Sequence, residues 1–157
     1  MARASSAGWS DVDRDGDLDC YLLNHSVHST ENYVPAEIRT RPDPLAGDRL
    51  FRNDGGRFTD VSREAGLFSS RVGYGLGVAA SDLNGDGYPD LYVANMWMAA
   101  GRRVVHDPEF KLVAKQGLHE EYRRHTKGNS LYRNRGDGSF EDVTDAAGIG
   151  DDAWGCG

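Results

Sequence analysis

The feature that most constrains the fold of this 157-residue chain is an internal repeat. The acidic segment at residues 11–19 returns at residues 82–90, and each copy runs directly into a short apolar stretch that ends in Asn. The phrase Leu-Phe-Arg-Asn…Phe-Thr-Asp-Val-Ser…Ala-Gly-Leu, within residues 50–67, returns as Leu-Tyr-Arg-Asn…Phe-Glu-Asp-Val-Thr…Ala-Gly-Ile within residues 131–149. A repeated phrase of this length predicts one supersecondary unit built twice.

The two units differ in the segments that interrupt them at the same place. These insertions are residues 25–47 and 96–128, which are 23 and 33 residues long. Asp107-Pro108 is typical of a helix start, so we expect the second insertion to be partly helical, whereas the prolines within residues 31–47 favour a loop. We therefore divide the chain into a first repeat at residues 1–77 and a second at residues 78–157, which ends where a third would begin.

Each unit offers four short strands. One lies before the acidic segment, as in the small-residue run 75–81; one follows it; and a hairpin follows the insertion across a Gly-rich connection such as Asn53–Gly56. Glycines inside a strand predict either a close approach of another backbone or crowding at a narrow axis. Four antiparallel strands per repeat are typical of a β-propeller blade, so we predict an all-β fold with about two blades of an incomplete β-propeller.

Two blades cannot close a ring, because propellers have about four to eight. We therefore expect this chain to be a piece of a larger propeller, with further blades of the same propeller as partners. Its two open faces should be apolar. We expect those faces to carry Val78, Leu91, Val93, Phe58 and Phe140.

The acidic segments have the spacing of a metal-binding loop. Asp-x-Asp-x-Asp-Gly-x-x-Asp places oxygen ligands at positions 1, 3, 5 and 9, a backbone carbonyl at position 7 and a turn-forming glycine at position 6. Clustered carboxylates repel one another without a cation, and oxygen ligands with loose geometry favour Ca²⁺. The predicted ligands are Asp11, Asp13, Asp15, Asp19 and the carbonyl of Asp17 in the first loop, and Asp82, Asn84, Asp86, Asp90 and the carbonyl of Tyr88 in the second.

Two other interpretations of the acidic segments fit the sequence less well. A solvated Asp/Gly turn would explain one copy, but two copies at matched positions, each followed by a strand, argue against it. An EF-hand requires a Glu at position 12 of the loop. That position holds Leu22 in the first segment and Val93 in the second, and the flanking patterns are those of strands.

The linked motifs resemble FG-GAP/VCBS repeats, most closely those in the propeller part of ASPIC/UnbV-type proteins. The resemblance rests on Asp-x-Asn-x-Asp-Gly-x-x-Asp-Leu-Tyr-Val-x-Asn, followed by Leu-Tyr-Arg-Asn…Phe-x-Asp-Val-Thr. It implies an integrin-α-like β-propeller with Ca²⁺ in the acidic loop of each blade. There are departures, since Ala4 and Ser6 stand where the second repeat has Gly75 and Gly77, and no ASPIC/UnbV module is present.

Composition and the motifs present argue against several classes of function. The net charge of −7 argues against a nucleic-acid partner, and no apolar run is long enough to span a membrane or to form a signal peptide. Because no catalytic motif is found, we expect a non-catalytic binding or adhesion scaffold rather than an enzyme. A Ca²⁺ requirement favours an extracellular, periplasmic or cell-surface location. The alternative is a propeller segment of a larger secreted enzyme whose catalytic residues lie partly elsewhere.

The insertions are the predicted binding surface. They differ between the repeats while the strands are alike, and loops on a rigid scaffold commonly carry recognition. Tyr, Trp and Arg are enriched at binding hot spots, so a protein or glycan ligand is expected there. The candidate contact residues are Tyr33, Trp97, Arg102, Arg103, His106, Tyr122 and Arg123.

Overall fold

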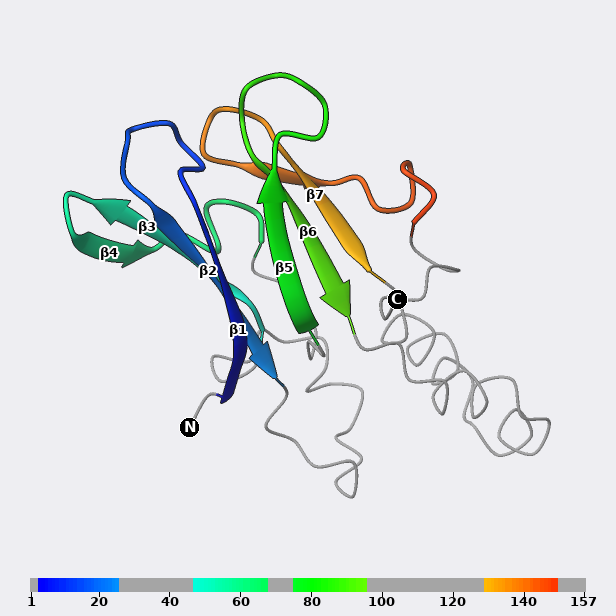
Figure 1. The fold of residues 1–157 in the computed structure, drawn as a ribbon, viewed down its shortest axis with the longest axis horizontal. Helices are drawn as coiled ribbons and strands as arrows, with labels where there is room; N and C mark the ends of the chain where they lie inside the picture. Colours follow the sequence, from blue (N-terminus) through cyan, green and yellow to red (C-terminus); the bar gives the residue numbers. More distant parts are fainter. Residues whose placement is uncertain (1–2, 26–46, 68–74, 96–128, 150–157) are drawn as a thin grey trace.

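The computed structural model describes residues 3–25, 47–67, 75–95 and 129–149, which form two four-stranded antiparallel sheets (Figure 1). The first sheet consists of β1 (Arg3–Ser10), β2 (Asp19–His25), β3 (Arg49–Asp54) and β4 (Arg57–Asp60), in that order. The second consists of β5 (Gly75–Ser81), β6 (Asp90–Asn95), β7 (Ser130–Asn134) and β8 (Phe140–Asp142). The prediction of an all-β fold with four strands per repeat is confirmed.

The two sheets also share the details of their pairing. The register between the first two strands shifts between Ala4 and Ser6 in one sheet and between Gly75 and Gly77 in the other. The predicted repeat boundary between residues 77 and 78 lies inside β5. The helices predicted in residues 107–128 lie outside the described residues, and among the described residues there is no helix, so none could span a membrane.

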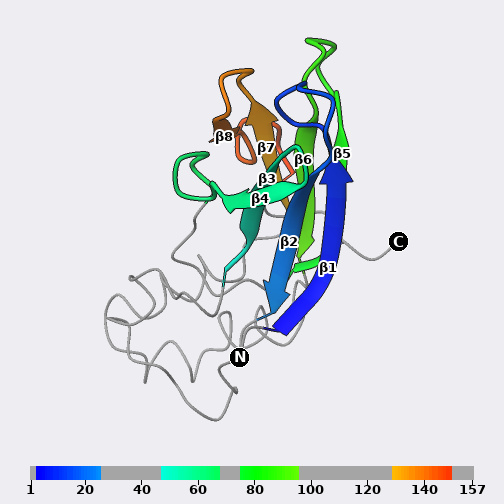
Figure 2. The ribbon, with the colours of Figure 1, turned by 90° about the vertical axis from the view of Figure 1, so that its left-hand side faces the viewer.

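The first strands of the two sheets lie side by side, as Figures 1 and 2 both show for β1 and β5. Glycine makes this approach possible. A Cβ atom on Gly8 would lie 2.7 Å from a γ-carbon of Val78, and one on Gly75 would lie 2.6 Å from a δ-carbon of Leu23. Both distances are too short for a real contact, so a side chain packs directly on each of these glycines. Crowding is therefore found at Gly75 of the predicted strand, whereas a Cβ atom on Gly77 would have no neighbour within 4 Å.

One hydrophobic core fills the space between the sheets. We call the face that the first sheet turns to the second its forward face, and the face that the second sheet turns to the first its rear face. The forward face contributes Val12, Tyr21, Leu23, Leu50, Ala65 and Leu67. The rear face contributes Leu91, Val93 and Phe140, with Val78, Ala80 and Tyr132 packed beside them.

The prediction for the open faces is wrong for most of the residues named. Leu91, Val93 and Phe140 are 1%, 2% and 7% exposed, and Val78 packs against the same core. Only Phe58, which is 48% exposed, lies on an open face. Alternation along a strand separates its two faces but does not say which face the neighbouring sheet covers.

The Ser or Thr of the repeated Asp-Val-Ser/Thr phrase binds the third strand of its own sheet. The hydroxyl of Ser62 accepts the backbone N–H of Leu50 at 2.9 Å, and that of Thr144 accepts the N–H of Leu131 at 3.0 Å. The chain then turns through the Ala-Gly-Leu/Ile phrase, where Gly66 and Gly148 have φ angles of 75° and 70° that favour glycine. The hydroxyl hydrogen bonds and the glycine turns give a structural reason for the Asp-Val-Ser/Thr and Ala-Gly-Leu/Ile phrases to recur.

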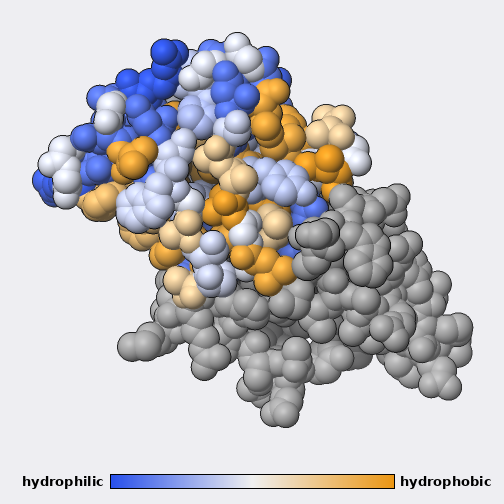
Figure 3. Space-filling model, in the orientation of Figure 1, coloured by the Kyte–Doolittle hydropathy of each residue, from blue (hydrophilic) through white to orange (hydrophobic). Residues whose placement is uncertain are grey.

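The two acidic loops emerge at the same end of the sheets, and that end carries much of the hydrophilic surface in Figure 3. Strands β2 and β6 run away from it (Figure 1), so the two insertions depart from the opposite end. Residues 26–46 and 96–128 of the insertions, which include all seven candidate contact residues, lie outside the described residues.

Candidate metal centre

The first carboxylate of each acidic segment folds the loop around itself. The two oxygens of Asp11 accept the backbone N–H groups of Asp15 and Gly16, each at 3.1 Å. Asp82 does the same for Asp86 at 3.1 Å and Gly87 at 2.9 Å. The repeated sequence therefore gives the two loops the same pair of hydrogen bonds to their first carboxylate.

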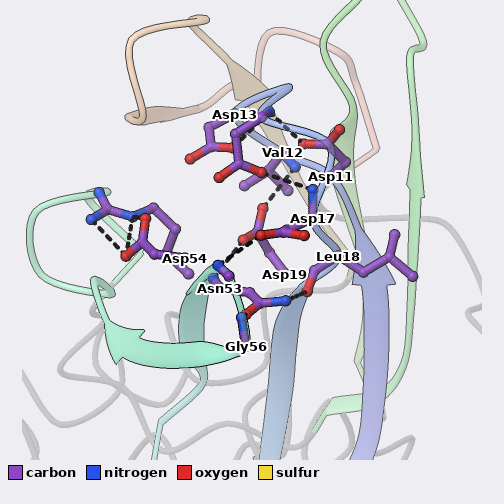
Figure 4. A network of polar contacts seen from close by, with 12 residues as sticks. Asp11, Val12, Asp13, Asp17, Leu18, Asp19, Asn53, Asp54 and Gly56 are labelled. Carbon is purple, nitrogen blue, oxygen red and sulfur yellow. Dashed lines mark hydrogen bonds and ion pairs between the residues drawn. The ribbon is translucent and has the colours of Figure 1, made fainter.

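Three carboxylates of the first loop converge. Oxygens of Asp11, Asp13 and Asp15 all lie within 4.8 Å of one another, and Asp11 and Asp13 are drawn in Figure 4. No other group of three or more acidic, His or Cys side chains gathers this closely in residues 3–25, 47–67, 75–95 and 129–149. The second loop has Asn84 at position 3, and its amide group donates to Asp86 at 2.8 Å.

The carboxylates at position 9 tie each loop to the body of its sheet. Asp19 is 1% exposed, and its oxygens accept the N–H groups of Val12 at 2.8 Å and Asn53 at 2.9 Å. Asp90 is 3% exposed and accepts those of Leu83 at 3.2 Å and Asn134 at 2.8 Å. These residues anchor the loops, and their predicted role as metal ligands stays a prediction.

The position-7 residues also lie close to the hairpins. The side chain of Asp17 accepts the N–H of Gly55 at 2.7 Å, which brings the β3–β4 turn against the first loop. The ring of Tyr88 lies beside Gly136 of the β7–β8 turn. Their carbonyls remain the predicted ligands at this position.

Sequence reasoning missed the roles of Asn53, next to the last residue of β3, and Asn134, the last residue of β7. The side chain of Asn53 donates to the carbonyl of Leu18 at 3.1 Å (Figure 4), and Asn134 donates to the matching carbonyl of Pro89 at 3.1 Å. Each asparagine therefore clamps the end of an acidic loop to the hairpin of its own sheet. The recurrence of Arg-Asn before both turns was the available signal.

The electrostatics of the two loops differ. Partial burial raises the pKa of Asp13, and the neighbouring carboxylates of Asp15 and Asp11 raise it further. In the second loop, the pKa of Asp86 is lowered because it accepts the backbone N–H of Tyr88 and the side-chain amide of Asn84. The first loop thus concentrates negative charge that a cation would relieve, while the second is partly relieved by its own amides.

Two contacts join the first acidic loop to the second sheet and its loop. The guanidinium carbon of Arg14 lies 5.3 Å from the ring centroid of Tyr88, within the range of a cation–π interaction. The second contact is a buried hydrogen bond of 2.8 Å, in which the Asn134 side chain donates to the carbonyl of Val12. The first loop is therefore held against both the second loop and β7.

The donor set suits a hard divalent cation. All side-chain ligands offered are oxygens, three are carboxylates within one turn of the first loop, and glycines at positive φ (Gly16 at 97° and Gly87 at 89°) permit the sharp turn. Oxygen ligands on a flexible loop fit Ca²⁺ better than Zn²⁺, which prefers nitrogen and sulfur ligands.

Repeated four-stranded antiparallel units are characteristic of β-propeller proteins, and in this chain an acidic loop connects the first two strands of each unit. The sequence model for the FG-GAP-like repeat matches residues 11–93, from the start of the first acidic loop into β6 and over half the chain. The chain therefore belongs to the FG-GAP-like repeat family, whose repeats build propellers typical of adhesion and binding scaffolds. No curated protein matches the chain closely enough to add to this assignment.

Proposed function

We propose that this chain is a Ca²⁺-stabilised propeller segment that serves as a non-catalytic binding scaffold outside the cytoplasm. The observation that carries the proposal is the convergence of the Asp11, Asp13 and Asp15 oxygens within 4.8 Å. In this proposal a Ca²⁺ ion would be held by these side chains with Asp19 and the carbonyl of Asp17. The second loop would use Asp82, Asn84, Asp86, Asp90 and the carbonyl of Tyr88.

The role of the cation would be structural. Each loop connects the first two strands of its sheet, and Asp19 and Asp90 already tie the loop to the end of the third strand. Neutralising the converging carboxylates would remove the repulsion that opposes this arrangement. A ligand that binds only the folded state stabilises it by about 2.7 kcal/mol at a hundredfold excess over its Kd.

Thermal unfolding in EGTA and in CaCl₂ tests the metal part of the proposal. We expect the midpoint to rise with CaCl₂, and the rise to shrink in Asp15→Asn, which loses a charge but keeps an acceptor for the N–H of Asp17. Asp137→Asn is the matched control, because Asp137 is an exposed turn carboxylate bound to Ser139 and lies outside both loops. A midpoint that is the same in EGTA and CaCl₂ contradicts the metal proposal.

The binding part of the proposal concerns the insertions. The strands on either side of residues 25–47 and 96–128 end at the same end of the two sheets, so both insertions depart from one side of the molecule (Figure 1). This supports a shared recognition surface for a protein or glycan ligand. Its location outside the cytoplasm and its kinship with ASPIC/UnbV-type propellers are parts of the same proposal.

Replacing each insertion in turn by a short Gly-Ser linker tests the binding part. The linker variants and the parent chain are screened against glycan arrays and surface proteins, with circular dichroism to confirm that the sheets persist. We expect a ligand of the parent chain to be lost in at least one variant. Ligand binding that survives both replacements assigns recognition to another surface, and hydrolytic turnover by the parent chain contradicts the non-catalytic role.

A further inference from the structure

A buried chain of hydrogen bonds connects the position-9 carboxylates of the two acidic loops. Asp19 accepts the backbone N–H of Val12, and the carbonyl of Val12 accepts the side chain of Asn134, each at 2.8 Å. The backbone N–H of Asn134 in turn donates to Asp90 at 2.8 Å. All four residues are buried, so these bonds are shielded from competition by bulk water.

The asparagine in this chain of bonds also holds the backbone of the second loop. The side chain of Asn134 donates to the carbonyl of Pro89 at 3.1 Å as well as to that of Val12. Val12 lies between two predicted ligands of the first loop, and Pro89 lies between two of the second. One side-chain amide is therefore shared by the backbones of both candidate metal loops.

A second contact between the loops is made by an arginine. The guanidinium carbon of Arg14 lies 5.3 Å from the ring centroid of Tyr88, and a Cβ atom on Gly87 would lie 3.1 Å from one of the guanidinium nitrogens. The N–H of Gly87 binds Asp82, and that of Tyr88 binds Asp86. Arg14 therefore lies against the part of the second loop that is folded around its own carboxylates.

The repeat itself does not require this arginine contact. The counterparts of Arg14 and Tyr88 are Gly85 and Asp17, which offer neither a cation nor a ring. Arg14 also adopts a φ of 65°, which favours glycine and is unfavourable for a residue with a side chain. The contact is thus a feature of this particular pair of loops.

We propose that the two loops bind divalent cations cooperatively through Asn134 and Arg14, so that a cation in either loop raises the affinity of the other. This inference rests on the proposed Ca²⁺ binding. A cation in the first loop would fix the backbone on both sides of Asp13, and with it the carbonyl of Val12 and the side chain of Arg14. These groups would then hold Asn134 and Tyr88 in place before the second cation binds.

The expected sign of the coupling follows from order and charge. Ordering a loop costs conformational free energy, and contacts that the first cation has already fixed reduce that cost for the second. Repulsion between the cations opposes this effect, but charges in exposed loops are screened over about 8 Å at physiological ionic strength. Coupling between two sites is reciprocal, so each loop should strengthen the other by the same factor, ~fivefold or more.

An NMR titration of the EGTA-treated chain with CaCl₂ tests the coupling. The amide signals of Gly16 and Gly87 report the first and the second loop separately, because each N–H binds the first carboxylate of its own loop. Asp15→Asn disables the first loop and Asp86→Asn the second. We expect the second loop of the parent chain to half-saturate at ~fivefold less CaCl₂ than in Asp15→Asn, and the first loop at ~fivefold less than in Asp86→Asn.

Variants of the two linking residues test whether their contacts carry the coupling. Arg14→Gln removes the guanidinium from an exposed position, and Asn134→Ser removes the amide that binds both loops. In each background the effect of Asp15→Asn on the second loop should be smaller than in the parent, and Arg14→Gln decides the test if Asn134→Ser does not fold. Two control backgrounds should keep the full effect: Arg57→Gln, at an exposed arginine of β4, and Asn53→Ser, which loses the equivalent clamp within the first sheet.

The possible outcomes separate the coupling from the metal binding on which it rests. If neither loop of the parent chain responds to CaCl₂, the metal proposal and the coupling are both wrong. If both loops bind but neither depends on the other, or if one weakens the other, the coupling alone is wrong. An effect of Asp15→Asn that is unchanged in Arg14→Gln, or that disappears in concentrated KCl, would contradict the role of the contacts, because charge alone would then explain it.

Discussion

The two sheets have nearly the same internal hydrogen bonds but different surroundings. In the first sheet the forward face is buried, with Leu50 1% exposed, whereas the equivalent Leu131 of the second sheet is partly open to solvent. The acidic loops differ too, because Asp13 of the first corresponds to Asn84 of the second. Features that equivalent residues share are therefore required by the fold of the repeat. Features that differ between them come from the position of each sheet in the molecule or from its own sequence.

The largest expected difference between the sheets is at this leucine pair. Leu50→Ala should lower the free energy of unfolding by about 2–5 kcal/mol, because it leaves a cavity in the core. Leu131→Ala should cost much less, about 1 kcal/mol, because solvent can reach the site and no closed cavity forms. Urea unfolding gives both values. Equal losses from the two substitutions would show that the covered and open faces do not differ in energy.

The second expected effect concerns Asp48, which stands where the second sheet has Asn129. Asp48 accepts the N–H of Asn24 at 3.1 Å and the hydroxyl of Tyr21 at 3.2 Å, and burial raises its pKa to about 6. The unfolded chain then loses this proton before the folded chain does. As the pH rises from about 4 to about 6, this group should cost about 3 kcal/mol of stability.

Asp48→Asn should remove that cost, since Asn129 accepts the N–H of Asn95 at 3.2 Å in the equivalent position. We expect the variant to match the parent near pH 4 and to be more stable at pH 7, as urea unfolding at each pH would measure. Asn129→Asp is the reciprocal variant and should lose stability over the same interval. If the free energies of unfolding of Asp48→Asn and the parent differed by the same amount at every pH, burial would not be raising the pKa of Asp48.

The smallest expected effect concerns position 4 of the acidic loops. Arg14 has a φ of 65°, in the region that favours glycine, and its counterpart Gly85 has a φ of 79°. Gly85→Ala should therefore cost about 1 kcal/mol of stability through backbone strain. Arg14→Gly relieves strain but loses the stacking on Tyr88, so its net effect should be below about 1 kcal/mol. A larger loss for Arg14→Gly than for Gly85→Ala in urea unfolding would show that the stacking outweighs the strain.

The repeat, the four strands per unit and the loop spacing could be predicted because each has a local signal. Turn-forming residues mark the ends of the strands, and each copy of the repeat supports the strand assignment made in the other. The core could not be assigned in the same way, since Phe58 and Phe140 occupy equivalent positions and only the second is buried. Burial there depends on which face meets a neighbour, and that is a property of the assembled sheets.

The candidate site was predictable to a similar extent. The spacing of the acidic segments places Asp11, Asp13 and Asp15 together, as the structure shows. It gives no indication that Asp19 and Asp90 bind backbone N–H groups of the third strand, because those partners lie far along the chain. Long-range hydrogen bonds of this kind require the tertiary structure.

We propose that both acidic loops bind Ca²⁺ and that the first binds it more tightly. Isothermal titration of the EGTA-treated chain with CaCl₂ tests this directly, alongside Asp15→Asn and Asp86→Asn, which keep their acceptors for Asp17 and Tyr88. We expect two sites in the parent chain, loss of the tighter one in Asp15→Asn and loss of the weaker one in Asp86→Asn. No heat of binding in the parent chain, or loss of the tighter site in Asp86→Asn, would contradict it.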